Sequence, residues 1–267
     1  MHAPTPSADG QTALRRAAQA CYAAIALGQV AFVAFLLGYY YPRTLSGDFA
    51  RWNDKPLIDG HITGDASGNA MFAVHVLLAA VITLGGLTQL IPAIRSRWPW
   101  LHRWTGRLFV VVALMLSLGG FWLTWVRGTH LTLPGAWGVT LNGLLIVGAA
   151  AMALREALAR RIIRHRRWAL RLFILASGVW FMRIFYMAWG IASGGAGIGK
   201  AMDGPADLII AFGNSLLPLA ILELYLFAET RGTPALRRAV ASLLWLSSLV
   251  ILGGSAGAWL LMWQPHL

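Results

Sequence analysis

The sequence predicts an all-α protein, a polytopic bundle of transmembrane helices. Hydrophobic residues make up 58% of the chain and charged residues 12%, with a mean hydropathy of +0.63. A chain of this composition lacks the polar surface that a soluble domain needs. Its apolar stretches are about 20 residues long, the length that a helix needs to cross about 30 Å of hydrocarbon. These observations exclude a soluble globular domain.

Seven apolar stretches can be placed along the chain. They lie near residues 18–40, 70–94, 105–126, 138–157, 168–191, 205–228 and 239–263. Together they predict one seven-helix transmembrane domain over residues 18–263, preceded by a tail over residues 1–17. The long connection over residues 41–69 carries four aspartates and a histidine. These residues follow no recognised metal-ligand spacing, so we expect a solvated exterior loop and no metal site.

Individual stretches carry further signals. The first is too long for a cleaved signal peptide. Pro218 lies inside the sixth and should bend it. In the last stretch Gly253 and Gly257 form a small-residue face for close helix contact, and Trp259 and Trp263 are expected in the aromatic belt at the exterior interface.

The distribution of arginine predicts the orientation. Arginines gather before the first stretch and around residues 95–107, 155–171 and 231–238, whereas aspartates gather in the alternate connections. Because arginine and lysine concentrate in short cytoplasmic loops, the N-terminus should be cytoplasmic and the C-terminus exterior, in a bacterial inner membrane. The net charge of +12 then indicates attraction to anionic lipid headgroups and argues against nucleic-acid binding.

One phrase occurs twice, at residues 102–109 (HRWTGRLF) and 165–173 (HRRWALRLF), where a basic connection meets an apolar stretch. Three interpretations stay open. His102 and His165 could ligate a haem b between two helices, with His75 a weaker ligand candidate. They could instead cap helix starts and join arginines in binding headgroups, or exchange protons at the cytoplasmic face.

Polar residues inside the hydrocarbon are costly and therefore point to sites. Counting the helical rise places Arg183, His75, Asn142 and Asn214 in one layer below the outer surface. Such a layer could bind an anionic or carbonyl-bearing ligand, or it could be a network of hydrogen bonds between helices.

A second set of polar residues lies near the cytoplasmic side. The same counting separates Glu223 from Arg183 by roughly 10 Å along the membrane normal, so we expect Glu223 to pair with Arg107 or Arg171 instead. The motif predicted at the cytoplasmic face comprises Arg103, Gly106, Arg107, Arg171 and Glu223.

The chain resembles a known family at several of these positions. His75, Gly85, Gly86, Gln89, Arg95, residues 101–107 (LHRWTGR), residues 165–168 (HRRW), Arg171 and Arg183 are similar to an uncharacterised bacterial multi-spanning family, domain of unknown function 2306. The resemblance spans roughly the second to sixth stretches and implies a membrane location, without an established activity. It implies that His75, His102, Arg103, Gly106, Arg107, His165 and Arg183 are motif positions.

A looser similarity is to cytochrome b561-type membrane proteins, in which a histidine inside a span is followed by a Leu-His-x-Trp helix start. His75 and residues 101–104 match that order. The fourth stretch has no histidine opposite His75, so this resemblance implies at most one haem, at His102 and His165. It is an analogy of pattern and does not by itself define a function.

Three classes of function remain open from the sequence. The protein could transfer electrons through haem between a quinone pool and an exterior acceptor, transport or bind an anionic or lipid-like small molecule, or serve as a non-catalytic partner in the assembly of another membrane protein. The sequence carries no nucleophile triad, zinc spacing or phosphate loop, which disfavours hydrolytic and nucleotide-driven enzymes. It does not define the oligomeric state.

Overall fold

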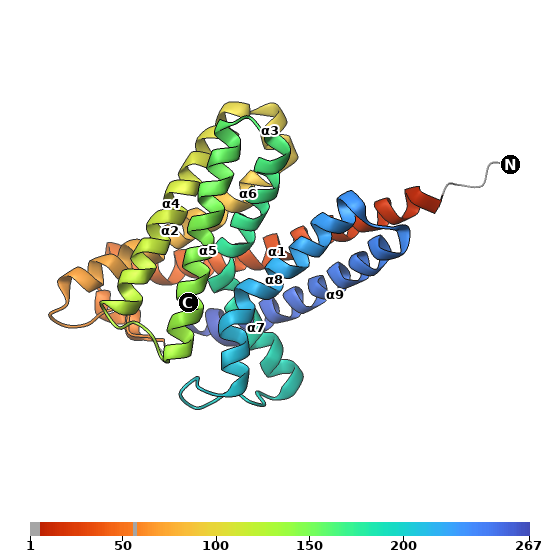
Figure 1. Cartoon of the computed structure of the whole chain (residues 1–267). Helices are drawn as coiled ribbons and strands as arrows, with labels where there is room; N and C mark the ends of the chain where they lie inside the picture. The colour runs from red at the N-terminus through yellow and green to blue at the C-terminus, as the bar shows by residue number, and fades with distance from the viewer. Residues whose placement is uncertain (1–5, 56–57) are drawn as a thin grey trace.

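The computed structural model describes residues 6–55 and 58–267, with the side chains of residues 6–9 excepted. The described residues form helices joined by short connections (Figure 1). The helices are α1 (Pro6–Leu45), α2 (Ala66–Gln89), α3 (Pro92–Arg97), α4 (Pro99–Trp125), α5 (Leu133–Leu158), α6 (Ile162–Ala176), α7 (Gly178–Ser193), α8 (Pro205–Arg231) and α9 (Pro234–Ala258). Short helical turns cover Phe49–Asn53, Trp259–Trp263 and Gln264–His266.

Within the described residues, six helices are individually long and apolar enough to cross a membrane. α6 and α7, which are bent by 54° relative to each other, are together long and apolar enough for a seventh crossing if the pair forms one span. The all-helical, multi-pass prediction is therefore confirmed. The fifth apolar stretch differs from expectation because it is two helices broken at Ser177, and residues 6–17 continue α1 without a separate tail.

Local sequence signals set several helix ends. Three helices are preceded directly by a residue whose side chain accepts a hydrogen bond from the backbone N–H group three residues further on. These residues are Asp65 before α2, at 2.9 Å, Thr132 before α5, at 3.2 Å, and Thr233 before α9, at 3.2 Å. These are N-cap bonds, which satisfy donors that the first turn of a helix leaves free. α8 runs unbroken through Pro218.

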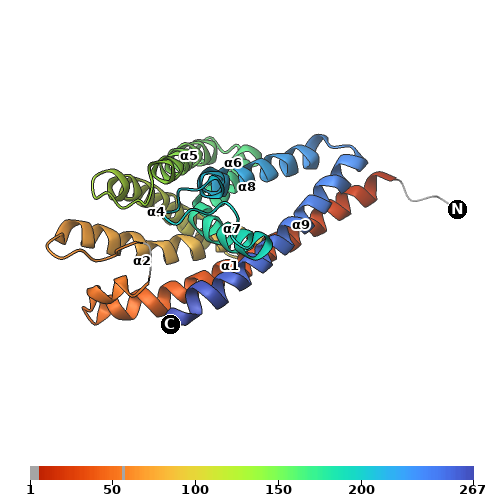
Figure 2. The same ribbon diagram turned by 90° about the horizontal axis from the view of Figure 1, so that it is seen from below.

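The helices form two groups that diverge at one end. α2, α4, α5 and α6 lie together, while α1 packs along α9 with α8 beside them and α7 near the junction (Figures 1 and 2). We call the end that carries α3 and the α5–α6 and α8–α9 connections the arginine-rich end. The ends of the two groups separate there, whereas further along the bundle α1 packs against α2 and α5 packs against α8.

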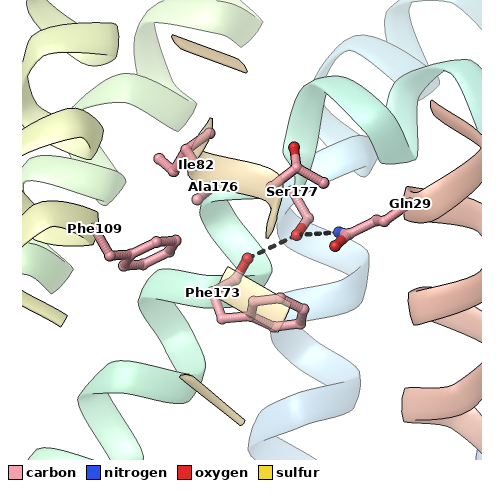
Figure 3. Close-up of a pocket in the computed structure, with 7 residues that line it drawn as sticks. Gln29, Ile82, Phe109, Phe173, Ala176 and Ser177 are labelled. Carbon is pink, nitrogen blue, oxygen red and sulfur yellow. Dashed lines mark hydrogen bonds between the residues drawn. The ribbon is translucent and has the colours of Figure 1, made fainter. Parts of the chain in front are cut away.

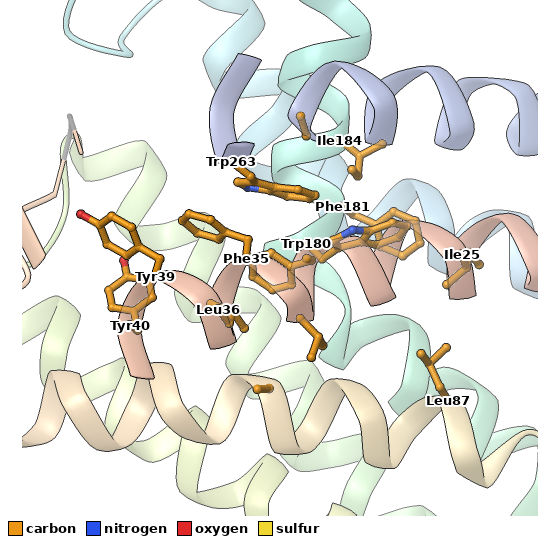
Figure 4. Packing of buried hydrophobic residues seen from close by; sticks show 14 of the residues in the cluster. Ile25, Phe35, Leu36, Tyr39, Tyr40, Leu87, Trp180, Phe181, Ile184 and Trp263 are labelled. Atoms are coloured by element: carbon orange, nitrogen blue, oxygen red, sulfur yellow. The ribbon is translucent and has the colours of Figure 1, made fainter. Parts of the chain in front are cut away.

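The largest cluster of buried side chains lies where α1, α7 and α9 meet. Figure 4 shows Phe35, Trp180, Ile184 and Trp263 packed across this junction. The Trp263 ring centroid lies 6.0 Å from that of Phe35. Trp263 is fully buried, so its assignment to the aromatic belt was wrong: the π-helical turn after α9 directs its ring toward α1 instead of the lipid.

The connection between α1 and α2 is fastened to the bundle by Arg127, which follows α4. Arg127 Nε donates to Asp65 Oδ2 at 2.8 Å, and Nη2 donates to Gly60 O at 3.1 Å and Asn69 Oδ1 at 2.8 Å. The hydrogen bond from Arg127 holds the pKa of Asp65 below its ordinary range. Among the described residues, no three His, Cys, Asp or Glu side chains are placed to hold a metal ion.

The Arg127→Ala variant should unfold at a lower temperature than the wild type near neutral pH. The Asp65 pKa is lowered in the folded state, so its pairing stabilises the fold above the ordinary pKa of 3.8, and this contribution is lost as the pH falls through the folded-state value. Thermal unfolding at a series of pH values should show the difference shrinking in acid. Arg51→Ala, which removes an exposed pair with Asp54, is the matched control and should cost little. A difference that does not depend on pH would contradict the carboxylate's role.

Candidate functional site

The two helix groups are bridged near the arginine-rich end by ion pairs between α6 and α8. Arg171 donates to both carboxylate oxygens of Glu223, at 2.6 and 2.7 Å. Arg166 makes a second two-point pair with Glu229, with both distances 3.1 Å. Of the two partners predicted for Glu223, Arg107 and Arg171, the structure shows Arg171.

A cavity of about 300 Å³ lies beside these pairs. It is lined by Arg167, Arg171, Glu223, Leu226, Phe227, Thr230 and Arg231. We call it the α6–α8 groove. Three guanidinium groups face one carboxylate there, so the groove carries an excess of positive charge beside an apolar wall.

The arginines of the groove are held in different ways. Arg167 Nη2 donates to Leu226 O and to the Thr230 hydroxyl, both at 3.3 Å. Arg171 is engaged by Glu223, and Arg231 is exposed and forms no ion pair within the described part of the chain. The groove therefore contains guanidinium donors that a bound oxyanion could share.

The repeated phrase forms the same local structure in both copies. Arg107 lies over the Trp104 ring at 4.9 Å, and Arg171 lies over the Trp168 ring at 4.6 Å. Trp and Arg are three residues apart in each copy, which places them on one helix face. Arg107 is thus stacked on its own helix, while Arg103 is exposed.

Gly106 has a packing role at the start of α4. A Cβ atom on Gly106 would lie 3.0 Å from Gln89 Oε1. Gln89 Nε2 donates to the Thr105 hydroxyl and, at 3.3 Å, to His102 O. Because Gly106 has no side chain, Gln89 of α2 can approach α4 closely enough to form these hydrogen bonds.

The two repeated histidines lie near the starts of α4 and α6. His102 lies within electrostatic range of both His165 and Arg95. His165 Nδ1 is 2.9 Å from Ala153 O, whereas His102 Nδ1 is buried and has no hydrogen-bond partner among the described residues. The arrangement leaves Nε2 of His165 available for another interaction.

The break between α6 and α7 has its own polar contacts. Gln29 Nε2 donates to the Ser177 hydroxyl at 2.8 Å, and that hydroxyl donates to Phe173 O at 2.8 Å (Figure 3). A cavity of about 10 Å³ adjoins these groups, close to the smallest space that holds one water molecule. The break is thus stabilised by a side chain from α1, far away in the sequence.

The four residues predicted in the outer layer each pack against a different neighbour. His75 faces α4, where Cβ atoms on Gly119 and Gly120 would lie 3.7 and 3.6 Å from its ring. Asn142 lies against Gly178 at the start of α7. Asn214 donates to Ile210 O and Ala211 O of its own helix. Arg183 lies over the Phe32 ring of α1. Within the described part of the chain, no hydrogen bond joins one of these four side chains to another.

Several polar residues of the interior were missed from the sequence. Gln29 and Ser177, with 2% and 6% of their surface exposed, define the break. Glu156 is buried near Arg155 and Arg161, at 3.5 and 3.8 Å. Asp207, which the sequence places at the top of the sixth stretch, accepts the Tyr186 hydroxyl at 2.9 Å in addition to two backbone N–H groups. Gln29 and Ser177 each occur singly in an apolar run, whereas Glu156 directly follows Arg155 in the sequence.

The fold and the site define a polytopic helical membrane protein with a cationic groove between two transmembrane helices. Residues 72–226, more than half of the chain, match the family described as "Predicted membrane protein (DUF2306)". The chain therefore belongs to the DUF2306 family. No curated protein sequence and no solved structure matches it.

Proposed function

We propose that this protein binds or transports an anionic amphiphile, whose head group occupies the α6–α8 groove. The observation that carries the proposal is the cavity of about 300 Å³ with three arginines and one glutamate in its lining. Guanidinium groups bind phosphate and carboxylate oxygens through paired hydrogen bonds. Basic pockets between transmembrane helices are a recurring form of anionic head-group site.

The apolar part of the groove supports a lipid-like ligand over a small soluble anion. Leu226 and Phe227 line the same cavity as the arginines, and half of the Phe227 side chain is exposed. An acyl chain could lie along these residues while the head group contacts Arg167 and Arg231. In the proposed orientation the groove faces the cytoplasmic leaflet of a bacterial inner membrane, where anionic lipids are available.

Thermal unfolding of the detergent-purified protein tests the proposal. A short-chain phosphatidylglycerol should raise the unfolding temperature more than the matching phosphatidylcholine, because a ligand that binds only the folded state stabilises it. Arg167→Ala combined with Arg231→Ala should weaken binding about tenfold, equivalent to about 1.4 kcal/mol. Arg164→Ala removes an exposed arginine of α6 outside the groove and should leave binding unchanged. Equal stabilisation by both lipids would overturn the proposal.

A second candidate function is haem-linked electron transfer between a quinone and an exterior acceptor. It is favoured by the positions of His102 and His165 near the starts of two helices and by the contact between His165 Nδ1 and Ala153 O. A backbone carbonyl at one ring nitrogen orients the other nitrogen, as is common for metal-ligating histidines. His102 and His165 would be the residues that hold a haem b, which would supply the redox chemistry when bound.

An absorption spectrum of protein purified from haem-replete cells tests this candidate. It should contain a Soret band that is lost in both His102→Ala and His165→Ala. His130→Ala, in the connection between α4 and α5, is the matched control and should keep the band. Absence of the band from the wild type would remove this candidate and leave the groove proposal standing.

A further inference from the structure

The charges that line the α6–α8 groove do not balance. Arg171 and Glu223 neutralise each other through their two-point pair, at 2.6 and 2.7 Å. Arg167 and Arg231 line the same cavity, and neither forms an ion pair within the described part of the chain. The groove therefore holds two guanidinium charges that no carboxylate compensates.

Every acidic residue of α6 and α8 already has a partner or lies far away. α6 contains no Asp or Glu, and α8 contains Asp207, Glu223 and Glu229. Glu229 pairs with Arg166 and accepts the Tyr225 hydroxyl at 3.2 Å. Asp207 is in the first turn of α8, at the opposite end of the helix from the groove. The two free charges of the groove therefore have no acid on these helices to pair with.

The neighbouring helices do not supply the missing negative charge either. On α5, the buried Glu156 lies 3.5 Å from Arg155 and 3.8 Å from Arg161. α7 and α9 contain only arginines as charged residues. A negative charge that balances the groove must therefore come from a ligand.

The end of α8 is less hostile to an anion than a free helix end. Carbonyl groups in the last turn of a helix carry partial negative charge and repel anions. Here Leu226 O accepts hydrogen bonds from Arg167 and the Thr230 hydroxyl, and Ala228 O accepts one from Arg237 Nε at 3.1 Å. These donors offset the repulsion at the groove.

On the basis of the function proposed above, we propose that the head group bound in the groove is a doubly ionised phosphate monoester. Such a group carries a charge of about −1.5 to −2 near neutral pH and has three acceptor oxygens. It matches the two uncompensated guanidinium groups in charge. A carboxylate or a phosphate diester carries a single negative charge and would leave one of these groups unpaired.

The donors of the two arginines are available to such a head group. Arg167 uses only Nη2 in its hydrogen bonds, and Arg231 is exposed and forms none within the described residues. Each guanidinium group can bind phosphate oxygens through paired N–H donors. The esterified oxygen would lead to acyl chains along Leu226 and Phe227, which line the same cavity.

Equilibrium binding of short-chain lipids to the full-length protein in neutral detergent tests this assignment. At about pH 8, dihexanoyl phosphatidate should bind about tenfold more tightly than dihexanoyl phosphatidylglycerol, a difference of about 1.4 kcal/mol. At about pH 5, below the second pKa of a phosphate monoester at about 6, both lipids carry one charge and should bind about equally. Protonation of the protein would affect both lipids, so the ratio of their affinities reports on the phosphate.

Single variants of the two free arginines should abolish the preference. Arg231→Gln and Arg167→Gln each remove one charge, so phosphatidate should bind less than about twofold more tightly than phosphatidylglycerol at about pH 8. Arg164→Ala, outside the groove, should keep the tenfold preference. Arg231 is exposed at the end of α8, so its replacement leaves the buried packing intact. Glycerophosphate, which lacks the acyl chains, should bind at least about tenfold more weakly than phosphatidate.

The outcomes separate this assignment from the function proposed for the groove. If both anionic lipids bind more tightly than phosphatidylcholine but equally to each other at the higher pH, the phosphate monoester is overturned and the groove proposal stands. A preference that persists in Arg231→Gln and Arg167→Gln, or at the lower pH, would also overturn it. Glycerophosphate bound as tightly as phosphatidate would overturn the amphiphile in favour of a soluble phosphate. If neither anionic lipid binds better than phosphatidylcholine, the groove proposal itself fails.

Discussion

Replacing Trp263 by alanine is expected to lower the free energy of unfolding by about 3 kcal/mol, at the lower end of the range for truncating a buried tryptophan. Trp263 is fully buried and packs on Phe32 and Phe35 of α1, with ring centroids 5.4 and 6.0 Å away. In a membrane the transfer from water contributes little, because the lipid is as apolar as the protein interior. The lost packing and the cavity left between α1 and α9 remain, and they account for the expected cost.

Unfolding by denaturing detergent, followed by circular dichroism, measures this effect. Trp245→Ala is the matched control on the same segment, because 51% of the Trp245 surface is exposed. It should cost much less than Trp263→Ala. Trp263→Phe should also be mild, since it keeps ring packing and removes an indole N–H that has no partner in the described residues. Equal losses in Trp263→Ala and Trp245→Ala would show that the π-helical turn is not packed against α1.

The multi-pass helical fold could be predicted because it depends on composition and on the length of apolar runs. Both are properties of the chain alone, and the six long apolar helices follow from them. The Arg171–Glu223 pair could be predicted for a similar reason. Depth along a helix is fixed by the rise per residue, so two charges that enter the hydrocarbon to the same depth are natural partners.

The sequence does not predict a contact that is decided by a position around the helix axis. It predicts a common depth for Arg183, His75, Asn142 and Asn214, but the direction of each side chain depends on how α2, α5, α7 and α8 pack. The same holds for Trp263, whose position near the end of the last span suits an interfacial belt, while the turn geometry buries it. Helix packing of this kind involves residues far apart in sequence and leaves no local pattern.

The break at Ser177 was not predictable for a related reason. Serine is tolerated within a helix, and the apolar run continues on both sides of it. The hydrogen bond from Gln29 to the Ser177 hydroxyl joins residues 148 positions apart. A helix break inside the membrane leaves backbone groups without their helical hydrogen bonds, and side chains from neighbouring helices stabilise such breaks. Only the folded structure shows which side chain does so.

Reversing the charge of Glu223 should destabilise the contact between α6 and α8 by about 2 kcal/mol, somewhat above the largest side-chain couplings typical of membrane helices. Glu223→Arg would place a fourth cation beside Arg167, Arg171 and Arg231 and would remove both hydrogen bonds to Arg171. The two helix groups diverge at this end (Figure 1). Thermal unfolding in neutral detergent should show the lower stability.

The double variant Arg171→Glu with Glu223→Arg distinguishes pairing from a general effect of charge. The exchange keeps the net charge and the opposite signs, so it should recover most of the stability lost in Glu223→Arg. Recovery should be incomplete, because Arg171 also stacks on Trp168 at 4.6 Å and glutamate cannot replace that contact. The double variant Arg166→Glu with Glu229→Arg exchanges the second ion pair between α6 and α8, and its unfolding temperature provides the comparison. If the Arg171–Glu223 exchange is no more stable than Glu223→Arg alone, the two groups of helices are held together by contacts other than this pair.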